Sequence, residues 1–175
     1  MAILSTLATV APYHVILYSL VFGSTAYQSF YAGIVAFKAL PHDKFSALQA
    51  RIFPGYFTFQ TAASAALLAS LSFMPLAGAA TAAYVSLGTA TVGGLINVTT
   101  MMPITKEIMA RRVKQQEIEG KHFKDPSASD EMKKINKEFG KSHGISILLN
   151  LAAFGGLLAY GVIMTDGFLI KNIPK

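Results

Sequence analysis

The sequence contains no cysteine, so disulfides, thiolate metal ligands and cysteine nucleophiles are all excluded. It also contains no tryptophan, which leaves tyrosine and phenylalanine to mark the boundaries of a membrane. Charged side chains make up only 14% of the 175 residues, while 53% are hydrophobic and the mean hydropathy is +0.46. This polarity is too low for the surface of an ordinary soluble domain, and it predicts a single membrane domain over residues 1–175.

Basic side chains are confined to a few places in the chain. None precedes Lys38, so the basic segment of a secretory signal and the Arg-rich character of a transit peptide are both missing. We therefore expect the first apolar segment to be retained. The net charge of +6 gathers in short connections rather than over one folded face, which argues against a nucleic-acid partner.

Long uncharged runs predict helices that cross a bilayer, since about 20 apolar residues span about 30 Å of hydrocarbon. The runs lack the period-two alternation of strands, and open strands in lipid would leave backbone groups unpaired. The two middle runs are separated near Pro75 and Gly78. The expected fold is an all-α membrane protein, a four-helix transmembrane bundle with amphipathic cytoplasmic helices. The four spans are placed at about 13–37, 55–74, 81–102 and 144–165.

The distribution of Lys and Arg predicts the orientation of these spans. Three lie in the connection 38–54 and ten in the connection 103–143, whereas only Lys171 and Lys175 lie elsewhere. Because cytoplasmic loops carry an excess of Lys and Arg, both connections are expected in the cytoplasm and both termini on the opposite side. Three tyrosines would then lie near the outer boundary, namely Tyr13, Tyr84 and Tyr160.

The two charged connections show helical spacing of apolar residues. Residues 40–52 predict a short amphipathic helix on the inner leaflet, or simply a helix that leads the chain back into the membrane. Span three is expected to project as a stalk that ends at Gly120, followed by a second amphipathic helix over 130–141. Seven acidic residues in the longer connection offset its attraction for anionic lipid, which indicates a solvated face.

Each span carries one side-chain amide at a similar depth, about 14 Å from the inner charges at 1.5 Å per residue. An unpaired amide in hydrocarbon costs several kcal/mol, so these groups should point into the bundle. They serve either as hydrogen bonds between helices or as a site for a bound molecule. The candidate intramembrane polar layer consists of Gln28, Gln60, Asn97 and Asn150.

Small residues recur at helical spacing on the predicted spans, as in Ser86, Ala90 and Gly94 on span three and the pair Gly155 and Gly156 on span four. Such ridges allow helices to approach closely. The sequence leaves open whether they pack within one chain or between two copies.

Catalytic and cofactor motifs are missing. There is no HExxH, GxSxG or Walker loop, and no ionisable residue lies in the middle of a span. The two histidines near the spans, His14 and His143, fall at opposite ends, which excludes a facing pair for haem. We therefore expect a non-enzymatic protein with no catalytic, cofactor-binding or metal-ligating residues.

Three sequence blocks resemble a known family. The block LPHDKFSALQARIFPGYF begins at Leu40, and two shorter blocks lie at the end of span three and the start of span four. The residues that carry the resemblance are Leu40, Pro41, Phe45, Gln49, Phe53, Pro54, Tyr56, Phe57, Pro103, His143, Gly144 and Asn150. On these residues the chain resembles the transmembrane protein 205 family. The resemblance implies four spans and an uncharacterised domain, in a family linked to drug resistance and vesicular or secretory transport.

These observations lead to an integral membrane protein that acts as an accessory subunit or interaction scaffold. The alternative is a small transporter or ligand-binding bundle that uses the amide layer. The expected partners are the lipid bilayer and a membrane protein or a second copy of the chain, with no nucleic acid. An endomembrane or plasma-membrane location is expected, with a mitochondrial membrane as the alternative.

Overall fold

A computed structural model describes residues 2–73 and 80–168 of the chain. All regular secondary structure in these residues is helical. The predicted break at Pro75 and Gly78, the end of the second span at residue 74, and both Lys171 and Lys175 lie outside the described residues. The elements are α1 (Ala2–Leu7), α2 (Ala11–Tyr27), a π-helical turn η1 (Gln28–Ala32), α3 (Gly33–Ala39), α4 (His42–Ser70), a 3-10 turn η2 (Leu71–Phe73), α5 (Ala80–Ile96), a second π-helical turn η3 (Asn97–Met101), α6 (Met102–Glu119) and α7 (Asp130–Phe168).

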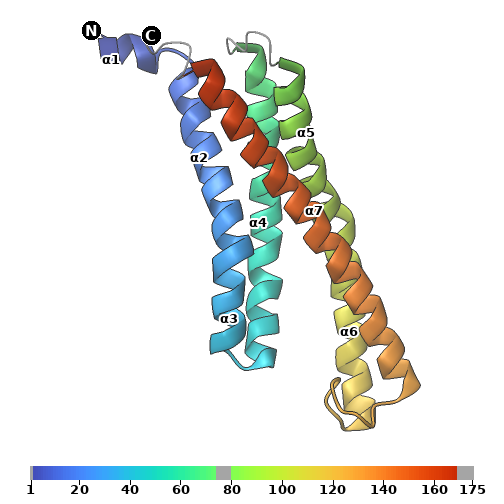
Figure 1. Cartoon of the computed structure of the whole chain (residues 1–175). Coiled ribbons are helices and arrows are strands. Elements are labelled where there is room, and N and C mark those ends of the chain that lie inside the picture. Colours follow the sequence, from blue (N-terminus) through green and yellow to red (C-terminus); the bar gives the residue numbers. More distant parts are fainter. Residues whose placement is uncertain (1, 74–79, 169–175) are drawn as a thin grey trace.

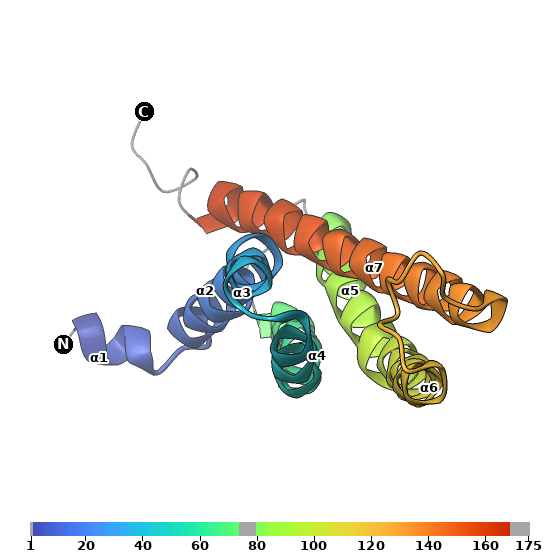
Figure 2. The same ribbon diagram turned by 90° about the horizontal axis from the view of Figure 1, so that it is seen from below.

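Within the described residues the long helices form four stretches, namely α2 to α3, α4, α5 to α6, and α7 (Figure 1). The stretch from α2 to α3 packs against α4, and α5 packs against both α4 and α7. Figure 2 shows α7 lying across the bundle, from α6 at one end to α2 at the other. The start of α2 and the end of α7 therefore lie at one end of the molecule, and the α3–α4 and α6–α7 connections lie at the other.

Two helices are longer than the sequence predicted. The segment 40–52 does not form a separate surface helix but belongs to the first half of α4, which runs unbroken for 29 residues with Pro54 inside it. Likewise, 130–141 and the predicted fourth span form one helix of 39 residues. Pro54 costs about 3 kcal/mol inside a helix, and Gly140 and Gly144 cost about 1 kcal/mol each. The packing of α4 and α7 against α5 outweighs these costs, so both helices continue through them. The predicted end at Gly120 is confirmed: α6 stops at Glu119, and Gly120 adopts a left-handed conformation with φ of 62°.

Among the described residues, two helical stretches are long and apolar enough to cross a membrane, namely Ala80–Glu119 and Asp130–Asp166. They contain the predicted third and fourth spans, and they support association with a membrane. The first two predicted spans, 13–37 and 55–74, are not among them.

The apolar core lies in the half of the bundle where all four stretches meet. Each stretch contributes fully buried side chains, such as Val21 from α2, Leu67 from α4, Leu87 from α5 and Leu157 from α7. Toward the other end the α3–α4 pair and the α6–α7 pair diverge (Figure 1).

Small residues let α5 and α7 approach until backbone meets backbone. A Cβ added to Gly156 would overlap the carbonyl oxygen of Ser86, and one added to Gly93 would lie 2.9 Å from the carbonyl oxygen of Leu149. Gly155, in contrast, faces open space. Ser86 and Ala90 of the small-residue ridge on α5 therefore meet α7 within the chain, at Gly156, whereas Gly94 of the same ridge meets Thr61 of α4.

Replacing Gly156 with Ala should destabilise the protein by about 1–3 kcal/mol, because the new methyl group forces α5 and α7 apart. Replacing its neighbour Gly155 with Ala is the matched control, and it should leave the melting temperature unchanged or raise it slightly. Thermal unfolding in detergent, followed by far-UV circular dichroism, checks both. Equal effects of the two substitutions would contradict the close approach.

Candidate functional site in the polar interior

A network of hydrogen bonds joins three helical stretches around Asn150 of α7. The Oδ1 of Asn150 accepts hydrogen bonds from the Tyr56 hydroxyl at 2.7 Å and from Gln60 Nε2 at 3.1 Å, both on α4. Its Nδ2 donates to the Ser29 hydroxyl at 2.7 Å, in the turn that follows α2. Gln60 Nε2 also lies 3.2 Å from the hydroxyl oxygen of Thr25. We call these five residues the Asn150 network.

Two of the four predicted amides, Gln60 and Asn150, therefore meet in this network. Asn97 lies apart from it and donates through Nδ2 to the backbone carbonyl of Ser146 on α7, at 3.3 Å. Gln28 makes neither contact, and its Nε2 is buried without a hydrogen-bond partner in the described structure. The structure thus pairs two amides directly, joins a third to a backbone carbonyl and leaves the fourth outside.

The remaining members of the network, Thr25, Ser29 and Tyr56, contribute hydroxyl groups. The sequence pattern did not indicate them for this role. Ser29 and Thr25 are four residues apart, as are Tyr56 and Gln60, so each pair shares one helix face. This four-residue spacing of polar side chains is the sequence signal that could have predicted the hydroxyl-bearing members of the network. An apolar helix with two polar residues on one face indicates a buried polar contact more strongly than one amide does.

Both π-helical turns begin at a predicted amide, Gln28 in the first and Asn97 in the second. A π turn inserts one residue into the helix, which rotates the following side chains by about 100°. The face that each residue presents therefore changes after the turn. Counting residues from the inner charges does not include this rotation, so it could not predict the partners of the amides.

The interior around the network is closely packed. The Oε1 of Gln60 has no hydrogen-bond partner in the described structure, and it faces α5 so closely that a Cβ on Gly94 would lie 3.2 Å from it. Two depressions of the described surface lie away from the Asn150 network. One, of about 330 Å³, is lined by α5 and α7 residues such as Val92 and Leu149, and none of the four predicted amides lines it.

A second polar cluster lies at the opposite end of the bundle. His14 is 2% exposed, with Nδ1 at 2.7 Å from the Ser70 hydroxyl and Nε2 at 2.5 Å from the Tyr160 hydroxyl. Because the Ser70 hydroxyl donates to the Leu67 carbonyl at 2.8 Å, we assign the histidine proton to Nδ1, and Tyr160 then donates to Nε2. Tyr160 is fully buried, so it does not mark the outer boundary as predicted. Its partner His14 provides the polar contact that an interior tyrosine needs.

The α6–α7 hairpin contains most of the charged connection 103–143, and it has its own polar contacts. The side chains of Arg111 and Glu138 form an ion pair across the two helices. The Ser129 hydroxyl donates to Glu119 Oε1 at 2.5 Å and accepts from the backbone N–H of Met132 at 3.1 Å, so Ser129 caps the start of α7. These contacts join the two helices of the hairpin to each other.

The two charged connections touch each other at this end. The ring of His42, at the start of α4, lies 4.9 Å from the ring of Phe123 in the α6–α7 connection. Burial lowers the pKa of His42 below its ordinary value, and the positive charge of Lys124 nearby lowers it further. Both effects favour the neutral form of His42 in this contact.

The residues that carry the family resemblance are brought together by the fold. The block from Leu40 to Phe57 forms the start of α4, where Pro41 immediately precedes the first helical residue. Tyr56 of this block donates its hydrogen bond to Asn150, 94 residues further along the chain. Two blocks that are distant in sequence thus meet in the Asn150 network.

Other residues of these blocks pack around the start of α4 and α7. Gln49 and Phe57 are buried, and the ring of Phe53 stacks on that of Phe57 at 5.4 Å. His143 stacks on Phe139 at 5.5 Å. No three His, Asp or Glu side chains converge as metal ligands within residues 2–73 and 80–168.

Comparisons with known proteins identify one domain and one relative. The model of a domain of unknown function, DUF4149, matches residues 16–114, from α2 into α6. Xanthocillin biosynthesis cluster protein D of Aspergillus fumigatus is 42% identical over 59 residues, which cover 34% of this chain and 38% of that protein. The chain therefore matches well under half the length of this relative. No solved structure matches the chain.

Replacing Asn150 with Leu should lower stability by about 1–3 kcal/mol, because Tyr56, Gln60 and Ser29 would all lose a buried partner. The matched control is Gln28→Leu, which removes an amide with no partner at Nε2 and should be neutral or stabilising. Thermal unfolding in detergent measures both changes. The network would lose its assigned role if Gln28→Leu proved as costly as Asn150→Leu.

Proposed function

The chain belongs to the DUF4149 family, and from that premise we propose that it is a non-enzymatic integral membrane protein acting as an accessory subunit or interaction scaffold. The observation that carries the proposal is the contrast between a closed interior and a projecting hairpin. Inside, polar groups bond to one another in the Asn150 network. Outside, the α6–α7 hairpin extends beyond the bundle and presents apolar residues such as Ile118, which is 68% exposed.

Four membrane spans are part of this proposal, at about 13–37, 55–74, 81–102 and 144–165. The support is the large apolar surface of all four helical stretches, which is unfavourable in water and suited to lipid. The exposed side chains include Ile16, Leu20 and Val35 from α2 and α3, Phe59 from α4, Val85 and Val92 from α5, and Leu148 and Val162 from α7. The charged connections at one end favour an orientation with both termini on the non-cytoplasmic side.

The finer family assignment is also a proposal. The three sequence blocks resemble the transmembrane protein 205 family, and this resemblance favours a role in vesicular or secretory transport or in drug resistance. The hydrogen bond between Tyr56 and Asn150 supports this family assignment, because it joins two of the three blocks. We propose an endomembrane or plasma-membrane location, with a mitochondrial membrane as the alternative.

A second candidate function is a small transporter or ligand-binding bundle. The observation in its favour is that buried amide atoms of Gln28, Gln60 and Asn97 have no hydrogen-bond partner in the described structure. A bound molecule could satisfy these atoms. The close packing of Gln60 against Gly94 weighs against it, so the scaffold is our first choice.

Cysteine labelling in the cysteine-free chain should distinguish four spans from two. With four spans, a membrane-impermeant maleimide added from the cytosol labels Asp43→Cys and Glu117→Cys, while Thr9→Cys and Thr81→Cys react only from the other side. If only the α5–α6 stretch and α7 crossed, Thr9, Asp43 and Thr81 would all react from the side opposite to Glu117. That second pattern would disprove the four-span arrangement.

Purification in mild detergent should test the scaffold. We expect the wild-type chain to elute with a stable partner or a second copy. The variant Ile118→Glu, changed on the exposed face of the hairpin, should elute without this partner and should keep the wild-type melting temperature. Ile3→Glu, an equally exposed isoleucine on α1, is the matched control and should keep the partner. Elution of the wild type as a lone monomer would overturn the proposal. Release of a small molecule that Gln60→Leu fails to bind would instead favour the transporter.

A further inference from the structure

A buried arginine without a counter-ion lies inside the cytoplasmic hairpin. Arg112 of α6 is 5% exposed, and its guanidinium carbon lies 4.5 Å from the ring centre of Phe123 and 4.1 Å from that of Phe139. The guanidinium is thus held between two aromatic rings. Its Nη1 has only the sulfur of Met109 as a partner, at 3.8 Å, and its Nε is buried with no partner in the described structure.

No acidic side chain of the described residues forms an ion pair with this guanidinium. All nine acidic residues of the sequence fall within the described part of the chain, and the ion pairs formed there join Lys44 to Asp43, Arg111 to Glu138 and Lys133 to Asp130. Arg112 is in none of them. A permanent charge removed from water costs several kcal/mol, and contacts with aromatic rings offset only part of this cost. An anion from another molecule would compensate the buried positive charge of Arg112.

A depression of about 480 Å³ opens beside Arg112, within the size range of small-molecule sites. Three cationic side chains line it, Arg112, Lys124 and Lys133, against one anionic side chain, Asp125. Asp125 accepts hydrogen bonds from the backbone N–H and the hydroxyl of Ser127, at 2.8 and 2.7 Å, so it is engaged within its own loop. Lys133 is paired with Asp130, so the excess of positive charge in the depression comes from Arg112 and Lys124.

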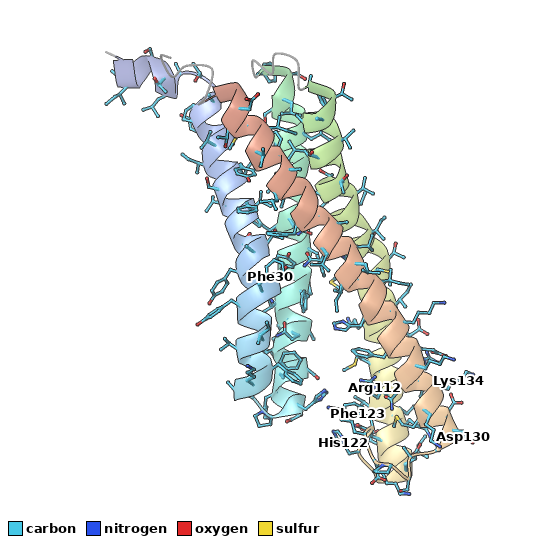
Figure 3. All side chains as sticks on the ribbon, viewed as in Figure 1. Phe30, Arg112, His122, Phe123, Asp130 and Lys134 are labelled. Carbon is cyan, nitrogen blue, oxygen red and sulfur yellow. The ribbon has the colours of Figure 1, made fainter. Side chains whose placement is uncertain are left out.

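The position of Arg112 in the fold makes this depression part of the hairpin rather than of the bundle. Figure 3 shows Arg112, His122 and Phe123 on the side of the hairpin that faces α3 and α4, with Asp130 and Lys134 on the other side, while Phe30 lies far away on the first helical stretch. Arg112 follows Met102 by ten residues in α6, which places it about 15 Å beyond the predicted end of span three.

We propose that this depression binds a phosphate monoester, with Arg112 as the principal ligand and Lys124 and Lys133 at its rim. The planar guanidinium fork pairs with two phosphate oxygens, and a monoester is close to dianionic at neutral pH, which suits the excess of positive charge. The distance from the membrane favours a soluble phosphate compound over a lipid headgroup. This binding site goes beyond the scaffold role.

The test measures the melting temperature of the detergent-purified full chain in inorganic phosphate or glycerol 3-phosphate, against sodium chloride at the same ionic strength. At ten times the dissociation constant, either phosphate should raise the melting temperature by about 3–5 °C. Arg112→Met should abolish this response and, without phosphate, should be at least as stable as the wild type, since it removes an uncompensated buried charge. Arg111→Met, the matched control on the exposed side of the same turn, should respond as the wild type does.

Two further arms keep the result decisive. If Arg112→Met does not fold, Arg112→Lys keeps the charge without the fork and should weaken phosphate binding on the order of tenfold. The second arm compares the melting temperature of the chain in phosphatidylcholine nanodiscs with and without phosphatidic acid. If phosphatidic acid stabilises the chain and the soluble phosphates do not, the phosphate site is supported and its ligand is a lipid. Absence of a response in all arms, an equal response of Arg112→Met, or a response to polyglutamate and not to phosphate would overturn the proposal.

Discussion

The need to pair every polar group inside an apolar bundle is the constraint on which the rest of this structure depends. Asn150 meets it by accepting from Tyr56 and Gln60 and donating to Ser29, which ties α7 to α4 and to the first helical stretch. In an apolar surrounding such bonds have no competition from water, so the helices that carry them have one preferred arrangement. Close approach then becomes feasible on the other side of α7, where Gly156 meets the backbone of α5.

The helices α4 and α7 extend without a break from the packed bundle to the charged connections. Because α4 and α7 run unbroken through their charged first halves, the positions of the two charged connections are set by packing deep inside the molecule. The contact between His42 and Phe123 closes the gap between the connections at the far end. A shift of α7 against α4 would therefore move the hairpin, which gives the interior a mechanical link to any partner that the hairpin holds.

The two polar regions of the protein differ in how well they are satisfied. In the interior, the Asn150 network and the His14 cluster bond largely within the chain, as expected of groups whose role is to hold helices together. In the hairpin, Arg112 keeps a buried charge that stacking on Phe123 and Phe139 only partly stabilises. Amide atoms of Gln28, Gln60 and Asn97 also lack a partner in the described structure, but these groups are neutral, whereas Arg112 carries a charge. This difference directs attention to the hairpin as the part that meets other molecules.

The sequence by itself determined the helical class, the apolar stretches, the gathering of charge at one end and the end of α6 at Gly120. These follow from local properties: hydrophobicity, the lengths of uncharged runs, and the left-handed conformation that glycine adopts readily. Only the tertiary structure decided that α4 and α7 are continuous, that Ser29 rather than Gln28 faces Asn150, and that Tyr160 lies buried against His14. Those outcomes depend on the rotation of each helix about its axis, which the π-helical turns alter, and on contacts between residues more than ninety positions apart. Hydropathy along a chain records depth in a membrane, whereas the partner of a side chain is set by the packing of one helix against another.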